Sequence, residues 1–106
     1  MHDDLVPEID IEELETRIAE GAPVIDVREP HEHAEAHIAG VTLMPLESVP
    51  DRVADVPTDA PVYLVCAMGG RSHRAAAFLR QHGIDAINVA GGTKAWIEAG
   101  KPVDTE

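Results

Sequence analysis

The chain has 106 residues, 44% of them hydrophobic, which is enough for one domain with its own core and short for two. Its formal net charge of −12 argues against nucleic acid as a partner, because phosphate binding needs a basic face. A single cysteine excludes an intrachain disulfide, and no apolar run reaches the length of a membrane span, so we expect no membrane partner.

The N-terminal part of the chain predicts a helix followed by a strand. Asp10 and Glu13 have the spacing of a capping box, and the apolar positions after them recur at helical intervals until Gly21 ends the pattern. Residues 24–27, with the sequence Val-Ile-Asp-Val, then form a short apolar strand that is followed by polar residues.

The middle of the chain predicts a short helix, a weak helix and two strands. Pro30 suits the first turn of a short helix that reaches about Ala36. Residues 41–44 predict the next strand, and residues 46–55, which lie among prolines, are weakly helical. Residues 62–65 form the most apolar strand, so we expect them at the centre of the sheet.

The last third of the chain predicts two helices around one strand. Ser72 is a favourable N-cap, and we predict that it begins a helix that ends at Gly83. Residues 86–89 form a strand, and residues 93–99 form a final helix that Gly100 closes.

This alternation of strands and helices is typical of an α/β domain with a mostly parallel central sheet and helices on both faces. We expect a single domain over residues 1–106, with its core at about residues 8–103. Ligands of such sheets collect beyond the carboxyl ends of the strands, and Cys66 lies at such an end.

Cys66 begins a glycine-rich turn between the apolar strand and the next helix. A thiol attacks as its thiolate, and a helix N-terminus with nearby arginine lowers an ordinary pKa of about 8.5. Gly69 and Gly70 allow positive φ and close backbone approach, so the amides between Cys66 and Ser72 can form an anion-binding nest. Cys66 is therefore a candidate nucleophile. The alternative is a buried structural cysteine, which does not explain the glycines and arginines that follow it.

Several short motifs occur in a characteristic order. They are Asp26-Val27-Arg28-Glu29-Pro30, His37-Ile38 with Gly40, the loop from Cys66 to Ser72, and Gly91-Gly92 ahead of Ala95-Trp96. Over about residues 8–103, the order and spacing of these motifs resemble those of single-domain rhodaneses, a family of sulfurtransferases. The resemblance implies a rhodanese-like domain and an enzyme in which Cys66 is the catalytic residue.

The resemblance implies transfer of a sulfane sulfur from thiosulfate or a persulfide donor to a thiol or cyanide acceptor. Cys66 would hold the sulfur as a persulfide between two steps of a covalent, ping-pong reaction. Loop amides and the helix dipole would stabilise the anionic sulfur, so we expect no cofactor. The expected partners are a small sulfur donor and a thiol acceptor, or a sulfur-acceptor protein, and the expected state is a monomer or weak dimer.

The resemblance assigns substrate binding to the rest of the loop, which consists of Ala67, Met68, Gly69, Gly70, Arg71 and Ser72. Arg71 occupies a position where many rhodaneses carry arginine, and its planar fork suits an oxyanion or a persulfide charge. Ala67 and Met68 differ from thiosulfate-active relatives, which often carry basic or polar side chains there, so this rim favours a persulfide donor. Arg74 is a secondary candidate, and pairing with an acidic neighbour is the favoured interpretation.

A histidine-rich segment superficially resembles a metal site. His33 and His37 would share one face of a helix, but His31 would not, and His37 matches a rhodanese histidine that belongs to the fold. We therefore expect no metal. Asp26 and Arg28 match residues that tie the first turns of rhodaneses to the sheet, so we interpret them as structural.

Two other functions remain open. A cysteine phosphatase or arsenate reductase also holds a thiolate in a loop before a helix, but its signature has one residue more between cysteine and arginine than this chain has. The other alternative is a rhodanese-like module that binds a partner or relays sulfur without efficient thiosulfate turnover. Inactive modules usually lack the cysteine, so Cys66 favours catalysis.

The termini and the charge suggest where the protein works. Residues 1–10 contain neither a basic nor an apolar segment, so we expect no secretory leader, and a reducing cytoplasm would keep the thiol available. The chain has 20 acidic residues against 8 Lys and Arg, which resembles proteins of a salt-rich cytoplasm, where screening relieves self-repulsion. The alternative is simply an acidic, soluble protein.

Overall fold

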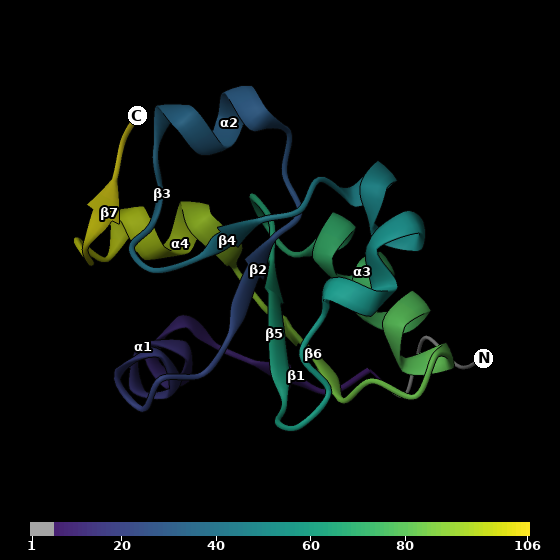
Figure 1. The fold of residues 1–106 in the computed structure, drawn as a ribbon. Helices are drawn as coiled ribbons and strands as arrows, with labels where there is room; N and C mark the ends of the chain where they lie inside the picture. The colour runs from purple at the N-terminus through teal and green to yellow at the C-terminus, as the bar shows by residue number, and fades with distance from the viewer. Residues whose placement is uncertain (1–5) are drawn as a thin grey trace.

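A five-stranded parallel sheet is the centre of the structure, a computed structural model that describes residues 6–106. Residues 1–5 lie outside the described residues. They form half of residues 1–10, where the sequence predicts no secretory leader. The strands are β1 (Glu8–Ile9), β2 (Val24–Asp26), β4 (Thr42–Leu43), β5 (Val62–Val65) and β6 (Ala86–Val89). Their order is β1-β6-β5-β2-β4, so β5 is the middle strand, as its apolar sequence predicts (Figure 1).

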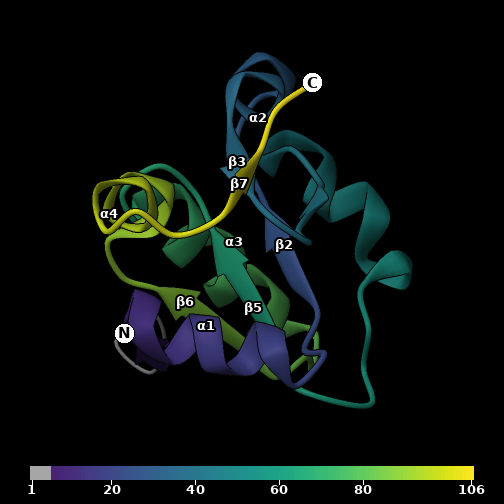
Figure 2. The same cartoon turned by 90° about the vertical axis from the view of Figure 1, so that its left-hand side faces the viewer.

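Helices cover both faces of this sheet, which confirms the predicted α/β class. They are α1 (Ile11–Ala19) and α4 (Gly92–Glu98) on one face, and α3 (Gly70–Gln81) with the 3₁₀ helix η2 (Leu46–Asp55) on the other (Figure 1 and Figure 2). A further short helix, α2 (Pro30–Glu35), follows the carboxyl end of β2. This arrangement leaves the carboxyl ends of β2 and β5 open to α2 and to the loop that leads into α3.

The core has two layers because successive side chains of β5 point to opposite faces of the sheet. Leu64 packs in the cluster that contains Leu79 of α3, and Val65 packs in the cluster that contains Leu14 of α1 and Trp96 of α4. All four residues of β5 are buried. A parallel strand that is covered on both faces lacks polar alternation, which explains why this segment is the most apolar one.

The N-terminus of α1 forms largely as predicted. The Asp10 carboxylate accepts the backbone N–H of Glu13 at 2.9 Å, as an N-cap does. The Glu13 side chain does not complete a capping box, because its carboxylate pairs with Arg17 one turn later at 2.8 Å. Asp10 therefore caps this helix alone.

Most elements match the prediction to within one residue at each end, but some do not. α3 begins at Gly70, two residues before the predicted start at Ser72. The strand β1 and the antiparallel pair of β3 (His37–Ile38) with β7 (Val103–Asp104) are not predicted. Each of these strands has only two residues, so none produces a readable alternation of apolar and polar side chains.

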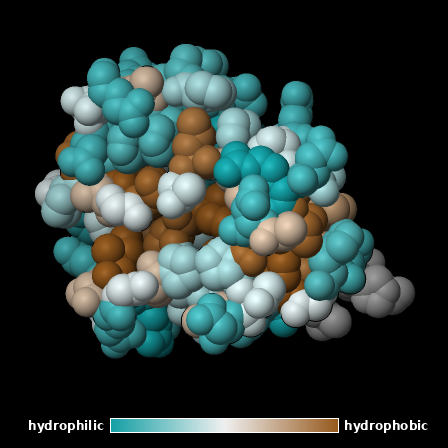
Figure 3. All heavy atoms as spheres, in the orientation of Figure 1, coloured by the Kyte–Doolittle hydropathy of each residue, from teal (hydrophilic) through white to brown (hydrophobic). Residues whose placement is uncertain are grey.

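Hydrophilic side chains surround apolar patches on the face that Figure 3 shows. Within residues 6–106, no helix combines the length and the apolar character that crossing a bilayer requires.

Candidate active site

Two backbone contacts from α4 hold the start of the loop that follows β5. The N–H of Thr93 donates to the carbonyl of Cys66 at 2.9 Å, and the N–H of Lys94 donates to the carbonyl of Ala67 at 3.0 Å. Gly92 permits this approach, because a Cβ at this position would lie 2.6 Å from both carbonyl oxygens. Since these carbonyls point toward α4, the amides that follow them in the loop are free to face the sulfur.

Gly69 turns the loop back onto Cys66. Its φ is +119°, in the left-handed region that favours glycine, and it is the N-cap of α3. Its N–H donates to the Sγ of Cys66 at 3.1 Å. Because α3 begins at the next residue, the positive end of its dipole lies beside the sulfur.

These contacts change the acidity of Cys66, which is buried with 2% of its surface exposed. Burial raises the pKa of the thiol, but hydrogen bonds from the Ser72 hydroxyl and from the backbone N–H groups of Ser72, Gly69 and Met68 lower it, and the net direction of the pKa is downward. The thiol therefore ionises more readily than an ordinary cysteine, which favours a nucleophilic role.

The predicted N-cap role of Ser72 is wrong, because Ser72 lies inside α3 and its side chain is buried. Its Oγ lies 3.3 Å from the Sγ of Cys66 and 2.6 Å from the Oδ1 of Asn88 on β6. The Nδ2 of Asn88 donates to the carbonyl of Gly69 at 3.2 Å and to the carboxylate of Glu8 on β1 at 2.8 Å. A chain of hydrogen bonds thus connects the sulfur to two neighbouring strands.

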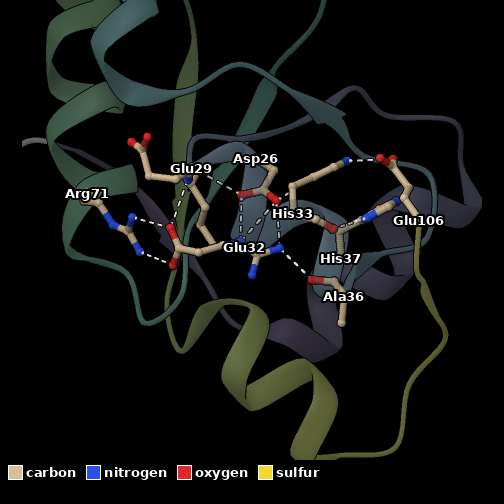
Figure 4. Close-up of polar contacts among 9 residues, drawn as sticks. Asp26, Glu29, Glu32, His33, Ala36, His37, Arg71 and Glu106 are labelled. Atoms are coloured by element: carbon tan, nitrogen blue, oxygen red, sulfur yellow. Dashed lines mark hydrogen bonds and ion pairs between the residues drawn. The ribbon is translucent and has the colours of Figure 1, made fainter.

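Arg71 binds a carboxylate of the protein itself. Its Nη1 and Nη2 donate to the Oε1 and Oε2 of Glu32 at 2.8 Å and 3.0 Å, and Figure 4 shows the two groups facing each other. The hydrogen bonds from Arg71, opposed by partial burial, hold the pKa of Glu32 at about 2. The guanidinium is half-buried. Substrate binding by Arg71 stays a prediction, and a substrate would have to compete with Glu32 for the guanidinium.

The remaining loop residues form an open rim. Met68 is 68% exposed, Gly70 is exposed and Ala67 is half-buried. Arg74 is also exposed, and no ion pair joins it to another residue between positions 6 and 106, so the acidic neighbour expected for it is not found there. The rim around Cys66 therefore presents an apolar side chain rather than a cluster of cations.

Asp26 and Arg28 make the structural contacts that the sequence predicts. The Asp26 carboxylate accepts from the Nε and Nη2 of Arg28, at 3.0 Å and 2.9 Å. Nη2 of Arg28 also donates to the carbonyl of Ala36. Nδ1 of His33 lies 2.9 Å from Asp26, and Figure 4 shows these two side chains together. These contacts tie α2 to the end of β2, and they hold Glu32 in reach of Arg71.

The histidines lie close together without the geometry of a metal site. The ligand atoms of His33, His37 and Glu106 lie within 4.8 Å of one another. The rings of His33 and His37 are stacked, with centroids 3.7 Å apart and planes inclined by 5°. Lone pairs of parallel rings point side by side, whereas a bound metal needs lone pairs that converge on it. The expectation of no metal stays a prediction.

The contacts that three residues make at the site were not predicted. Asn88 stands in an otherwise apolar strand, where asparagine is unusual, and this was a readable signal. Glu32 lies among histidines and 39 residues away from Arg71, so nothing local indicates their pairing. The sequence around Gly92 indicates the start of a helix, but the contact of Gly92 with the carbonyls of the loop depends on the tertiary fold.

The site as a whole is suited to an anionic sulfur. Amide N–H groups, one hydroxyl and a helix N-terminus surround Cys66, and such groups stabilise developing negative charge without reorganisation.

Comparison with known proteins identifies the family. Residues 10–99 match the rhodanese-like domain. A sulfurtransferase of Allochromatium vinosum is 36% identical over 102 residues, which cover 93% of this chain and 95% of that protein. The thiosulfate sulfurtransferase GlpE of Pseudomonas putida is 40% identical over 87% of this chain and 84% of its own length. The crystal structure of a rhodanese-related protein from Thermoplasma volcanium, 34% identical, covers 94% of this chain and 99% of its own with a TM-score of 0.88. The chain therefore belongs to the rhodanese family and is a sulfurtransferase of the rhodanese type.

Proposed function

We propose that Cys66 carries a sulfane sulfur between a persulfide or thiosulfate donor and a thiol or cyanide acceptor. In the first step the thiolate attacks the outer sulfur of the donor, a Cys66 persulfide forms, and the donor leaves as a thiolate or as sulfite. In the second step the acceptor attacks that outer sulfur, and the electron pair of the broken S–S bond returns to Cys66. The observation that carries this proposal is the buried Sγ, which has the Gly69 N–H at 3.1 Å and lies at a helix N-terminus.

We also propose that a low-molecular-weight persulfide is a better donor than thiosulfate. Thiosulfate is a dianion, and both terminal nitrogens of Arg71 are already bound to Glu32. The most exposed side chain of the loop, Met68, is apolar. A dianion therefore finds little compensation for the loss of its hydration at this rim, whereas a persulfide has a neutral form and an organic carrier.

A cavity beside the loop offers room for such a carrier. Its volume is about 330 Å³, and it lies next to Cys66 without including it. Its lining consists of Arg28, Ala67 of the loop, and Thr93, Lys94, Ile97 and Glu98 of α4. Ile97 is 46% exposed. The Thr93 hydroxyl is buried and has no hydrogen-bond partner within residues 6–106, so it is available to a polar group of the bound molecule.

Sulfur relay to a partner protein is the second candidate function. The observation that favours it is the same exposed apolar rim, Met68 with Ile97, because exposed apolar side chains beside the sulfur also suit docking of an acceptor protein. A relay would show loading of Cys66 but slow release to small thiols.

The decisive experiment compares wild type with Cys66→Ser, using thiosulfate and glutathione persulfide as donors and cyanide or a small thiol as acceptor. Cys66 is the only cysteine of the chain, so a mass gain of one sulfur in the intact protein is assigned to it without mapping. We expect loading of wild type alone, and faster turnover with the persulfide. Undiminished transfer by Cys66→Ser would overturn the role of Cys66, and faster turnover with thiosulfate would overturn the donor preference.

A further inference from the structure

Ser72 has one hydroxyl proton and two neighbours that compete for it. The Oγ lies 2.6 Å from the Oδ1 of Asn88 and 3.3 Å from the Sγ of Cys66. A hydroxyl donates once and accepts with its lone pairs, so both contacts cannot be donated at the same time. The position of this proton depends on which neighbour is the better acceptor.

The orientation of the Asn88 amide decides where the Ser72 proton lies while Cys66 is neutral. Its amide nitrogen donates to the carbonyl of Gly69 at 3.2 Å and to the carboxylate of Glu8 at 2.8 Å, and both partners can only accept. The Oδ1 therefore faces Ser72, and a contact of 2.6 Å between two oxygens requires a proton between them. While Cys66 is a neutral thiol, the amide oxygen of Asn88 is the closer and the better acceptor, so the Ser72 proton points to Asn88 and the Ser72 lone pairs face the sulfur.

Loss of the thiol proton reverses this arrangement. A thiolate would face the lone pairs of Ser72, which is repulsive, and a charged acceptor attracts a donor more strongly than a neutral amide does. Rotation of one hydroxyl brings its proton onto the Sγ, and Asn88 then loses a hydrogen bond inside the protein, where it is 1% exposed. The amide of Asn88 therefore competes with the thiolate for the same proton.

We propose that Asn88 is a positioning residue that holds the Ser72 proton away from Cys66 while the sulfur is neutral and releases it when negative charge forms on Sγ. The proposal rests on Cys66 as the residue that carries sulfur. In the persulfide the charge sits on the outer sulfur, so the Ser72 proton returns to Asn88. When an acceptor thiolate attacks that outer sulfur and the S–S bond breaks, the electron pair goes to Sγ, and the Ser72 proton rotates to meet it.

Most charged groups on the elements around the sulfur are paired, and Arg74 of α3 is exposed and has no ion pair within residues 6–106. Arg71 of α3 is bound to Glu32 of α2, and Lys94 of α4 pairs with Glu98 at 2.6 Å. Glu8 of β1 contacts the far side of the Asn88 amide. Ser72→Ala leaves all of these contacts in place, whereas Asn88→Leu also removes the hydrogen bond to Glu8. The double variant carries the same loss, so its comparison with Asn88→Leu isolates the Ser72 hydroxyl.

The test measures the pKa of Cys66 from the pH dependence of alkylation by iodoacetamide, in wild type, Ser72→Ala, Asn88→Leu and the double variant. Ser72→Ala removes the donor and should raise the pKa by about 1 unit, whereas Asn88→Leu removes the competitor at similar volume and should lower it by about 0.5 to 1 unit. The double variant should match Ser72→Ala, because Asn88 acts only through Ser72. Ser48→Ala, in η2, is the control for loss of a serine hydroxyl.

A structural role would give a different result. If Asn88 only braces the loop, Asn88→Leu loosens the amides around the sulfur, and the pKa rises as it does in Ser72→Ala. A rise, or a double variant that differs from Ser72→Ala, would overturn the proposal. The titration uses the free thiol, so it is independent of whether Cys66 loads sulfur, which the mass measurement tests separately.

A second measurement keeps the proposal testable if Asn88→Leu does not fold. Asn88 is the only asparagine in the chain, so labelling with ¹⁵N-asparagine gives one side-chain amide signal. In wild type its NMR shift should follow the ionisation of Cys66, and in Ser72→Ala this dependence should be largely lost. An equal dependence in both proteins would show that Asn88 senses the charge without the Ser72 proton and would refute the switch.

Discussion

Replacement of Glu32 by glutamine removes the charge that binds Arg71 and keeps the shape of the side chain. The pKa of Glu32 lies at about 2 instead of 4.5, a difference that corresponds to about 3 kcal/mol. The side chains of Arg71 and Glu32 are 33% and 25% exposed, so solvent screening reduces this value. We expect Glu32→Gln to lower the free energy of unfolding by about 1 kcal/mol at neutral pH.

The pH dependence gives this prediction its sign. Folding lowers the pKa of Glu32, so the pair stabilises the protein fully above pH 4.5 and loses its contribution as the pH falls toward about 2. The difference between wild type and Glu32→Gln, measured by urea unfolding, should be constant from about pH 7 to pH 5 and shrink by more than half at about pH 3. A difference that stays constant down to about pH 3 would refute the ion-pair argument.

The same substitution tests the influence of Glu32 on the donor. In Glu32→Gln the guanidinium of Arg71 has no carboxylate partner, so it is free to bind the oxyanion of thiosulfate. We expect kcat/KM for thiosulfate to rise several-fold, with little change for glutathione persulfide. Glu35→Gln, on the same helix and exposed, is the matched control for loss of one negative charge. An equal gain in both variants would mean that general charge, and not release of Arg71, is responsible.

Two further predictions concern the loop and the surface. Gly92→Ala should lower stability by about 2 to 4 kcal/mol and slow sulfur transfer strongly, because its Cβ would lie 2.6 Å from the carbonyls of Cys66 and Ala67. Gly83→Ala has a φ of +81° but no atom within 4 Å of the new Cβ, so thermal unfolding should show a loss of only about 1 kcal/mol and activity should be retained. The net charge of −12 predicts that the unfolding temperature rises in molar KCl if the surface is adapted to salt, and a flat series would remove that interpretation.

Most elements that the sequence predicts have enough residues to show a period, and β4, with two residues, is the exception. β5 has four buried apolar residues and α1 has an N-cap with an apolar stripe, and both form at the expected positions. β1, β3 and β7 have two residues each, and they exist because β6 and the C-terminal segment offer backbone partners. The local sequence gives no information about such partners, so these strands could not be predicted.

The contacts of the candidate site also fall into local ones, which the sequence predicts, and long-range ones, which it does not. The turn at Gly69 and the position of Cys66 after an apolar strand are properties of adjacent residues, and the sequence predicts them. The pairing of Arg71 with Glu32 spans 39 residues, and that of Asn88 with Glu8 spans 80. Contacts of this kind depend on the strand order, in which β6 lies between β1 and β5. The sequence therefore indicates the candidate nucleophile and the loop amides around it, but not the long-range partners Glu32 and Asn88.

The misplaced start of α3 shows how a small error in a boundary changes the chemistry. As an N-cap, Ser72 would direct its hydroxyl toward the backbone N–H groups of its own helix. Gly69 adopts positive φ and caps the helix without a side chain, so α3 begins two residues earlier and Ser72 falls on its buried side. Among residues 6–106, the hydroxyl then contacts the sulfur of Cys66 and the amide of Asn88. The glycine that lets the backbone approach the sulfur therefore also places a residue suited to capping beside Cys66, where its hydroxyl contacts the sulfur.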